Sequence, residues 1–419
     1  MINVNRFFVM LLGVALLAAS QVWAEQEPAA GNVARAEPLA TRSNSLAGQM
    51  NNSFAIDLYS HLVGKEGNLF FSPTSIQTAL EMTWAGAHGK TADEMAKALH
   101  LDAGAGGEKL GALLQSLNAD GKQGGYELAV ANALWGAKAY PFQPAFLARV
   151  ERDFGGHLSD VDFVGDPEGA RKTINDWVAG QTHDKIRDLL PARSVDAYTR
   201  LVLTNAIYFK AKWDLPFRKE ATQDGDFTLV DGKKVKAPLM HQTKHFRYAE
   251  DDSVQVLELP YGHGDLAMQV FLPKSPDGLA AFEKGMTAQR LAALIGQLKS
   301  ENVNVTLPRF NVHRSYELGP VLQEMGMKLA FDGDQADFSG MTTAERVAIS
   351  KVIHKTFVNV DEDGTEAAAA TAVIMMAGSA FRPIPPKVFT ADHPFVFAIV
   401  HQKSGAMLFM GRLAEAAKE

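Results

Sequence analysis

Helix and strand patterns follow one another from Leu46 to Leu413 without a linker or an internal repeat. Strand patterns, which are rich in Val, Phe, Leu and Tyr, occur in YELAVANALW, RLVLTNAIYF, VQVLEL, DLAMQVFLP, NVNVTLPRF, PFVFAIV and AMLFMGRL. Helical patterns lie between them, as in GARKTINDWVAGQ and TAQRLAALIGQL. Because no stretch rich in Pro, Gly and Ser separates these segments, we expect one large α+β domain with extensive antiparallel sheets.

Capping residues predict where two helices begin. Ser72 directly precedes Pro73, which is the order typical of an N-cap followed by the first helical residue. Thr91 and Glu94 have the spacing of a capping box, which predicts that a second helix begins at Thr91.

The composition excludes several classes of function. The chain has 419 residues and a net charge of -7, so no basic field favours nucleic acid or anionic lipid. Cysteine is absent, which excludes disulfides, thiol catalysis and zinc sites with Cys ligands.

The N-terminus has the pattern of an export signal. One cation in MINVNR precedes the apolar run FFVMLLGVALLAAS, and VWA ends at Ala24, so we predict a signal peptide over residues 1–24. An uncleaved membrane anchor is the alternative, although the run is short for a membrane span. Residues 25–45 then form a flexible leader and residues 46–417 the folded domain, in a secreted or periplasmic protein. This style of signal and the lack of cysteine fit a bacterial protein.

Motifs of known catalytic sites are absent from the sequence. G-x-S-x-G, S-x-x-K and H-E-x-x-H do not occur, and the GKT at residues 89–91 lacks the first glycine of a phosphate-binding loop because that position is Trp84. His241 and His245 are four residues apart, but their surroundings favour an extended chain and not a helical metal site. We therefore expect no enzymatic activity, no metal and no organic cofactor.

Residues 361–386 form a segment with little commitment to a secondary structure, DEDGTEAAAATAVIMMAGSAFRPIPP. Its alanines favour a helix, yet Val373, Ile374 and Gly378 do not continue an amphipathic helical pattern. The alternatives are a plain surface loop followed by an Ala-rich helix, or an extended segment with a function of its own.

Several separated strings together resemble the serpin family. They are NLFFSPTSIQTALEMTWAGAHGKTADEM, LTNAIYFKAKWDLPF, LPRF, ISKVIHKTFVNVDEDGTEAAAATA and DHPFVFAIVHQKSGAMLFMGRL, which occur in the family's order over residues 46–415. The resemblance implies a single-domain fold with a large, mainly antiparallel central sheet, further sheets, about eight or nine helices and an exposed reactive-centre loop at about residues 362–386.

The resemblance also implies a mechanism, in which a protease attacks the loop and forms an acyl-enzyme. The cut loop then inserts as a strand into the main sheet, carries the protease to the far pole and stops deacylation. The hinge of this loop comprises Gly364, Thr365, Glu366, Ala367, Ala368, Ala369, Ala370 and Thr371. If Thr365 is the first inserted residue, alternation turns inward only small or apolar side chains, at Thr365, Ala367, Ala369, Thr371, Val373 and Met375. The one charge, Glu366, then faces outward. Apart from it, the hinge carries none of the bulky, charged or proline residues frequent in non-inhibitory members.

Two further groups are implied by matching positions. Ser72, Ser75, Asn205 and His354 match the family's shutter, which controls the parting of the central strands. Trp213, Arg309 and Glu362 match the breach, where insertion begins, with the last two as an ion pair.

The position of the cut and the target are less closely defined. Counting 16 residues from Glu362 places the scissile bond at Gly378–Ser379, with Met376, Ala377, Phe381 and Arg382 as neighbouring candidates. Small residues around this bond favour elastase-like or subtilisin-like serine proteases, while papain-like cysteine proteases are a further option. We expect a monomeric, irreversible inhibitor. The alternative is a non-inhibitory serpin that acts as a binding or chaperone-like protein or as a protease substrate.

Overall fold

The computed structural model describes residues 45–64, 67–101, 111–114, 117, 125–138, 140–154, 156–365 and 385–416. The predicted signal peptide and leader, and residues 366–384 of the predicted loop, lie outside these ranges. None of the helices in the described ranges is both long and apolar enough to cross a membrane.

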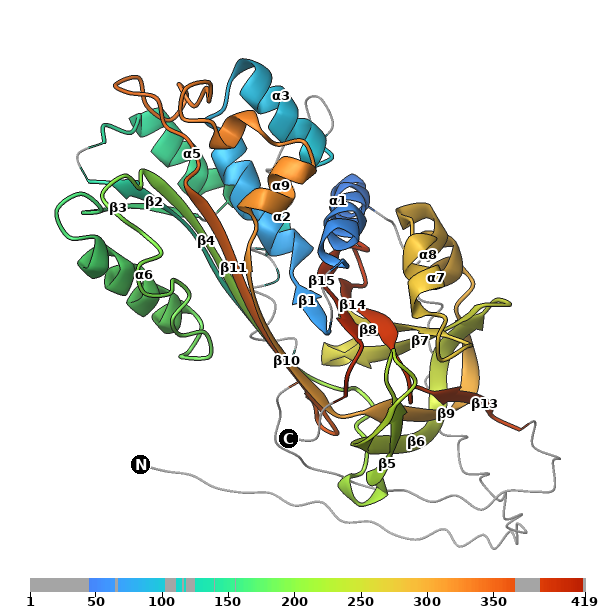
Figure 1. The fold of residues 1–419 in the computed structure, drawn as a ribbon. Coiled ribbons are helices and arrows are strands. Elements are labelled where there is room, and N and C mark those ends of the chain that lie inside the picture. The colour runs from blue at the N-terminus through green and yellow to red at the C-terminus, as the bar shows by residue number, and fades with distance from the viewer. Residues whose placement is uncertain are drawn as a thin grey trace, which may run out of the picture. The chain divides into compact units, whose positions relative to one another are not determined.

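One of two sheets has six strands in the order β10–β11–β12–β4–β2–β3, and β2, β4 and β11 run along its length (Figure 1). The strand β4 pairs antiparallel with β2, and β11 pairs antiparallel with β10, while β4 and β11 pair with each other in parallel. The strands are β2 (Tyr126–Ala137), β3 (His157–Val161), β4 (Leu201–Lys212), β10 (Phe310–Glu317), β11 (Lys351–Asp361) and β12 (Gly364–Thr365).

The second sheet has nine strands in the order β1–β15–β14–β8–β7–β6–β9–β13, with β5 paired to β6. All its pairings are antiparallel except that of β13 with β9. The strands are β1 (Leu69–Phe71), β5 (Gln223–Thr228), β6 (Lys234–Glu250), β7 (Val254–Tyr261), β8 (Leu266–Pro273), β9 (Lys299–Pro308), β13 (Lys387–Thr390), β14 (Phe395–His401) and β15 (Met407–Leu413).

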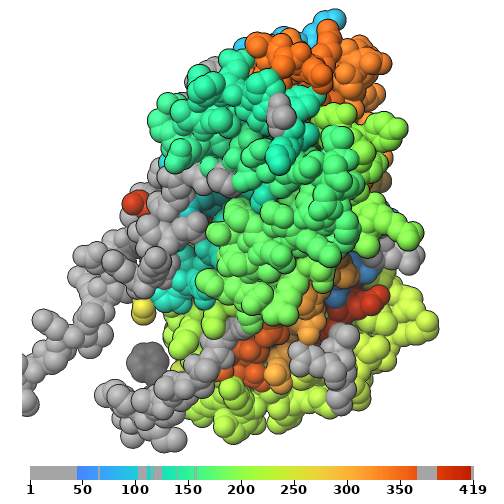
Figure 2. Space-filling model, turned by 90° about the vertical axis from the view of Figure 1, so that its left-hand side faces the viewer, coloured from blue at the N-terminus to red at the C-terminus, as the bar shows by residue number. Residues whose placement is uncertain are grey.

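Helices cover these sheets and complete three apolar cores. On one face of the six-stranded sheet, α6 places Trp177 edge-on against Trp135 of β2, and this is the face that Figure 2 views. On the other face, α2 contacts β2, β4 and β15 and so joins the two sheets. The helices are α1 (Leu46–Leu62), α2 (Pro73–Trp84), α3 (Gly89–Ala98), α5 (Pro144–Phe154), α6 (Pro167–Gln181), α7 (Leu279–Lys284), α8 (Ala288–Gly296) and α9 (Gly319–Glu324), with short 3-10 turns η1 (Lys219–Ala221), η2 (Gly262–Gly264) and η3 (Leu329–Phe331).

The architecture confirms the predicted single α+β domain, and each of the seven predicted strand stretches contains a strand. Ser72 caps α2 as expected, because its hydroxyl oxygen accepts a hydrogen bond from Ser75 N. The predicted start of the next helix is wrong by two residues, since α3 begins at Gly89. Thr91 Oγ1 instead accepts from Asp337 N, and Glu94 Oε2 accepts from two amides of the 328–329 segment. Both side chains predicted to cap the helix therefore bind backbone amides that are distant in sequence instead.

Candidate functional site

The central strands of the six-stranded sheet part at one end. β4 and β11 pair directly over seven positions, from Val202–Lys351 to Tyr208–Phe357. Beyond these positions β12 lies between them, and Thr365 pairs with Ala211 on one side and with Val360 on the other. We call this region, formed by residues 208–212, 357–361 and 364–365, the fork. A chain that continued from β12 would have to separate β4 from β11.

The first two residues of the predicted hinge, Gly364 and Thr365, form β12 and lie in the fork. Gly364 has a φ of +146°, and a Cβ atom there would lie 2.1 Å from Ala211 O, so only glycine fits. Thr365 is fully buried and its Oγ1 lies 2.9 Å from Tyr261 Oη, which confirms that its side chain faces inward. The other six predicted hinge residues, 366–371, lie outside the described part of the chain.

Trp213 directly follows β4, next to the residue that pairs with Gly364 of β12. Its ring stacks on Tyr261 with centroids 4.1 Å apart, and its Nε1 donates to Asp361 O at 2.9 Å. Its backbone N donates to Asp363 O at 3.1 Å, so both N–H groups of Trp213 hold the turn that leads into β12. Trp213 thus contacts the turn that precedes β12, and its role at the start of insertion stays a prediction.

Arg309 and Glu362 form the predicted ion pair, with 3.5 Å between Nε and Oε2. The Glu362 side chain is almost completely buried, whereas Arg309 is half-exposed. Thr222 Oγ1 donates to Glu362 Oε1 at 2.5 Å, and Glu362 O accepts from Phe217 N at 2.9 Å. Neither of these partners was predicted. Arg309 and Thr222 therefore hold the carboxylate, while the Phe217 amide holds the backbone of Glu362, and together they fix the start of the predicted loop.

A second ion pair that the sequence did not indicate lies beside the first one. Lys219 Nζ is 2.9 Å from Asp363 Oδ2, and the hydrogen bond to Asp363 raises the pKa of Lys219. Burial raises the pKa of Asp361, whose Oδ1 accepts from the backbone N of Asp363 and of Gly364. The acidic run at residues 361–363 is thus a folded turn in which each carboxylate has a separate partner.

The four predicted shutter residues form one buried hydrogen-bond network. Ser72 N donates to His354 Nε2 at 3.1 Å, so the ring proton is on Nδ1, which donates to Asn205 Oδ1. Asn205 Nδ2 donates to Ser75 Oγ at 2.6 Å, and Ser72 Oγ donates to Leu408 O at 2.6 Å. Burial lowers the pKa of His354 to about 3, so the imidazole is neutral. The network therefore joins α2 to both strands of the seam between β4 and β11.

One member of this network, Asn132, and one residue that packs against it, Tyr316, were missed. Asn132 of β2 lies opposite Asn205, and its Oδ1 accepts from Asn205 Nδ2 and from Ser75 Oγ, the latter at 3.0 Å. Tyr316 of β10 lies opposite His354 and stacks on its ring. An asparagine within the apolar strand pattern ANALW was the available signal for Asn132. The polar row thus crosses four strands of the sheet.

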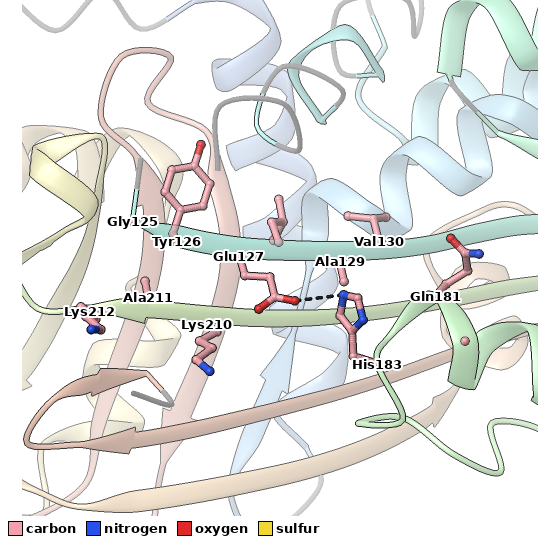
Figure 3. A pocket seen from close by; sticks show the side chains of 12 residues that line it. Gly125, Tyr126, Glu127, Ala129, Val130, Gln181, His183, Lys210, Ala211 and Lys212 are labelled. Atoms are coloured by element: carbon pink, nitrogen blue, oxygen red, sulfur yellow. Dashed lines mark ion pairs between the residues drawn. The ribbon is translucent and has the colours of Figure 1, made fainter. Parts of the chain in front are cut away.

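A surface pocket of about 740 Å³ lies beside the fork, between β2, β4 and the end of α6. Figure 3 shows Glu127 and His183 joined by an ion pair, at 3.0 Å, with Lys210 close by. Glu127 and Lys210 are opposite each other on neighbouring strands, and Lys212 is the partner of Gly364. The pocket therefore lies against the part of β4 that would meet the next residues of an inserting strand.

The far end of the loop returns to the second sheet at β13. Lys387 Nζ lies 2.9 Å from Glu250 Oε1, and Gln255 Nε2 donates to Val388 O at 2.8 Å. Hydrogen bonds from Lys387 and Lys274 lower the pKa of Glu250 to about 2. The candidate scissile residues 376–379, 381 and 382 lie outside the described ranges.

The histidine pair in β6 is extended, as predicted. His241 Nδ1 lies 3.0 Å from Thr306 Oγ1, and among the described residues no group of three or more His, Cys, Asp or Glu could hold a metal ion.

Comparisons with known proteins agree with this geometry. Residues 49–416 match the family model described as serpin (serine protease inhibitor). The human leukocyte elastase inhibitor is 43% identical over 379 residues, which cover 87% of this chain and 98% of that protein. An uncharacterized serpin-like protein of Thermococcus kodakarensis is 42% identical over 366 residues, covering 86% of this chain and 84% of that protein. The structure of uncleaved ovalbumin has a TM-score of 0.79 at 29% identity and covers 88% of this chain and 99% of that chain.

These relatives come from an archaeon and from a mammal, so the comparisons do not support the predicted bacterial origin. Origin and export both stay predictions. The family assignment itself rests on nearly the whole folded chain, from α1 to the end of β15. The chain belongs to the serpin family of serine protease inhibitors.

Proposed function

We propose that this protein is an irreversible suicide-substrate inhibitor of serine endopeptidases. The observation that carries this proposal is the fork, in which the start of the loop already lies as a strand between β4 and β11. A loop that is cut beyond residue 371 would be free to continue along the same path. Each step exchanges the pairing of β4 with β11 for pairing with the new strand on both sides.

The register of β12 predicts where each loop residue goes. Because Thr365 pairs with Ala211 and Val360, residue 371 would lie between Asn205 and His354, and residue 375 beside Leu201. The ten steps from residue 365 to 375 span about 33 Å at the usual rise of a strand. The inserted strand would therefore cover the whole length over which β4 and β11 now pair.

Thr371 would enter the shutter with its side chain inward, on the side that Thr365 occupies now. Insertion breaks the bond between His354 and Asn205, and a buried polar group without a partner costs about 1–3 kcal/mol. The Thr371 hydroxyl can accept from His354 Nδ1 and donate to Asn205 Oδ1. The same residues would thus be satisfied before and after insertion.

Glu366 would face outward beside Lys210, whose other neighbour across the sheet is Glu127 (Figure 3). The single charge of the hinge would then have a lysine partner at the edge of the pocket. An outward carboxylate at this position is compatible with insertion, whereas an inward one is not.

The chemistry of trapping begins as ordinary proteolysis. The serine hydroxyl of the protease adds to the carbonyl carbon of the scissile residue, the C–N bond breaks, and the new amine leaves with the serine proton. The ester that remains is hydrolysed only if water adds to its carbonyl and the serine oxygen leaves. Insertion of the loop before this second step would carry the protease away with the ester intact, in a distorted state.

Small residues around Gly378–Ser379 support an elastase-like or subtilisin-like target, and the name of the human relative points in the same direction. Cysteine endopeptidases of the papain type form the analogous thioester and are included in the proposal. We further propose that the protein is a monomer exported through the signal peptide 1–24.

Mixing the mature protein with elastase, subtilisin, trypsin and chymotrypsin tests this function. We expect a band at the summed mass that resists SDS, together with a released C-terminal peptide whose first residue identifies the scissile bond. Clean cleavage by every protease without that band would contradict inhibition. The non-inhibitory alternative, in which the chain is a binding protein or a substrate, would then be preferred.

A further inference from the structure

Tyr198 is the most exposed large hydrophobic residue in the described part of the chain, with 85% of its surface accessible. It lies three residues before Leu201, where β4 begins, at the end of the sheet opposite the fork. Val164, which is also largely exposed, lies in the turn after β3 at the same end. Aromatic residues are enriched at protein–protein interfaces relative to the rest of the surface.

The turn that carries Tyr198 is well braced. Tyr198 N donates to Asp196 Oδ1 at 2.9 Å, and Asp196 N donates to Thr199 Oγ1 at 3.0 Å. The Arg200 guanidinium donates to Ala197 O at 2.8 Å, and the backbone N of Arg200 donates to Ser350 Oγ at 3.2 Å. A fixed turn presents its aromatic ring at little cost in conformational entropy, which favours an interface.

The register of the fork leads to this turn. Each residue further along the inserted strand would lie one residue further back along β4. Residue 375 would therefore lie beside Leu201, and Gly378, three residues later, would lie at the level of Tyr198. A protease attached at or near residue 378 would thus lie about 10 Å beyond the end of the sheet. The surface it would meet is formed by the segments that enter β4 and β11, where Ser350 N donates to Leu201 O.

We propose that the turn at residues 196–200, with Tyr198 at its corner and Arg200 beside it, is the surface against which the trapped protease is held. This inference rests on the proposed function. Tyr and Arg are the residue types most frequent in interface hot spots, and here they lie where the tether ends. Contact with Tyr198 holds the acylated protease in its distorted position and so slows the addition of water to the ester.

The test compares Tyr198→Ser with the matched control Val230→Ser, which removes another largely exposed apolar side chain from the turn between β5 and β6. Both positions are on the surface, so neither change affects the core. Each variant is reacted with the protease that the wild-type protein traps. The yield of SDS-resistant complex is measured first, and then the rate at which active protease returns from the purified complex. The rise in thermal midpoint after loop cleavage is recorded as a measure of insertion.

We expect equal complex yield and an equal rise in thermal midpoint for all three proteins. Protease should return on the order of tenfold faster from the Tyr198→Ser complex, which corresponds to ~1.4 kcal/mol. An unchanged rate of return for Tyr198→Ser would overturn this inference and leave the proposed function intact. Absence of a complex with the wild-type protein would overturn both, and the two failures are therefore distinguishable.

Discussion

Moving one carboxylate of the hinge by one position tests which hinge side chains would face the core once the loop has inserted. The double variant Glu366→Ala/Ala367→Glu keeps the composition and charge of the hinge but turns the carboxylate inward. By the register of β12, residue 367 would lie between Phe209 and Val358, both of which are buried in an apolar core. The single variant Glu366→Ala is the matched control, because it removes the outward charge without adding an inward one.

The expected slowing of insertion follows from the free energy needed to protonate the carboxylate at position 367 before it is buried. Glutamate has an ordinary pKa of about 4.3, so burying it as the neutral acid at pH 7 costs about 3.7 kcal/mol. The neutral carboxyl without a partner adds about 1–3 kcal/mol. Residue 367 is the second residue after β12, so this cost arises at the start of insertion. The protonation cost alone slows insertion about 500-fold.

The assay is the number of inhibitor molecules consumed for each protease molecule trapped. We expect the double variant to be cleaved as a substrate with little SDS-resistant complex, while Glu366→Ala still traps the protease. Because the cost is protonation, lowering the pH from 8 to 6 should reduce the defect relative to wild type about tenfold for each pH unit. Trapping by the double variant as efficient as that of wild type at pH 8 would refute the inward parity of residue 367.

Three further predictions concern the fork and the shutter. The folded-state pKa of His354 is about 3, below the ordinary value of 6.5, so its contribution to stability is complete above pH 6.5 and is lost as the pH falls toward 3. Urea unfolding should show a loss of about 2 kcal/mol between pH 7 and pH 5 that His354→Asn lacks. Glu362→Lys places a cation beside Arg309, and native gels after mild heating should show polymers; a variant that stays monomeric would count against a restraining role. Gly364→Ala should lower the stability of the uncleaved protein by about 1–3 kcal/mol in thermal unfolding, because its Cβ would collide with Ala211 O, and an unchanged midpoint would contradict the strained geometry.

The secondary structure could be predicted where local signals and tertiary structure agree. Ser72 and Pro73 specify the start of α2 by themselves, and the structure confirms it. Thr91 and Glu94 have an equally good local signal, yet their side chains bind amides of residues 328–337. Nothing within ten residues of Thr91 indicates those amides. The error therefore reflects competition from partners that are distant in sequence.

The sequence predicted only those residues of the candidate site that match positions known from the serpin family. Ser72, Ser75, Asn205 and His354 were matched by position, and the structure brings them into one network. Asn132 was missed because its role depends on the pairing of β2 with β4, a register that sequence patterns do not give. The same holds for Thr222 and Lys219, whose partners are defined by the turn before β12.

The polar row across the seam between β4 and β11 is compatible with the proposed single opening of the sheet. If the side chains at this seam were all apolar, an inserting strand would have to replace their packing contacts and no side-chain hydrogen bond. In this chain the pairing of β4 with β11 is supplemented by a side-chain hydrogen bond between Asn205 and His354, and water cannot satisfy these groups because they are buried. Separating the two strands is therefore costly unless a hydroxyl group arrives at the same time. In the proposed mechanism Thr371 would bring that hydroxyl only after the loop had entered by six residues in register, so the network would resist spontaneous opening and accept the cleaved loop.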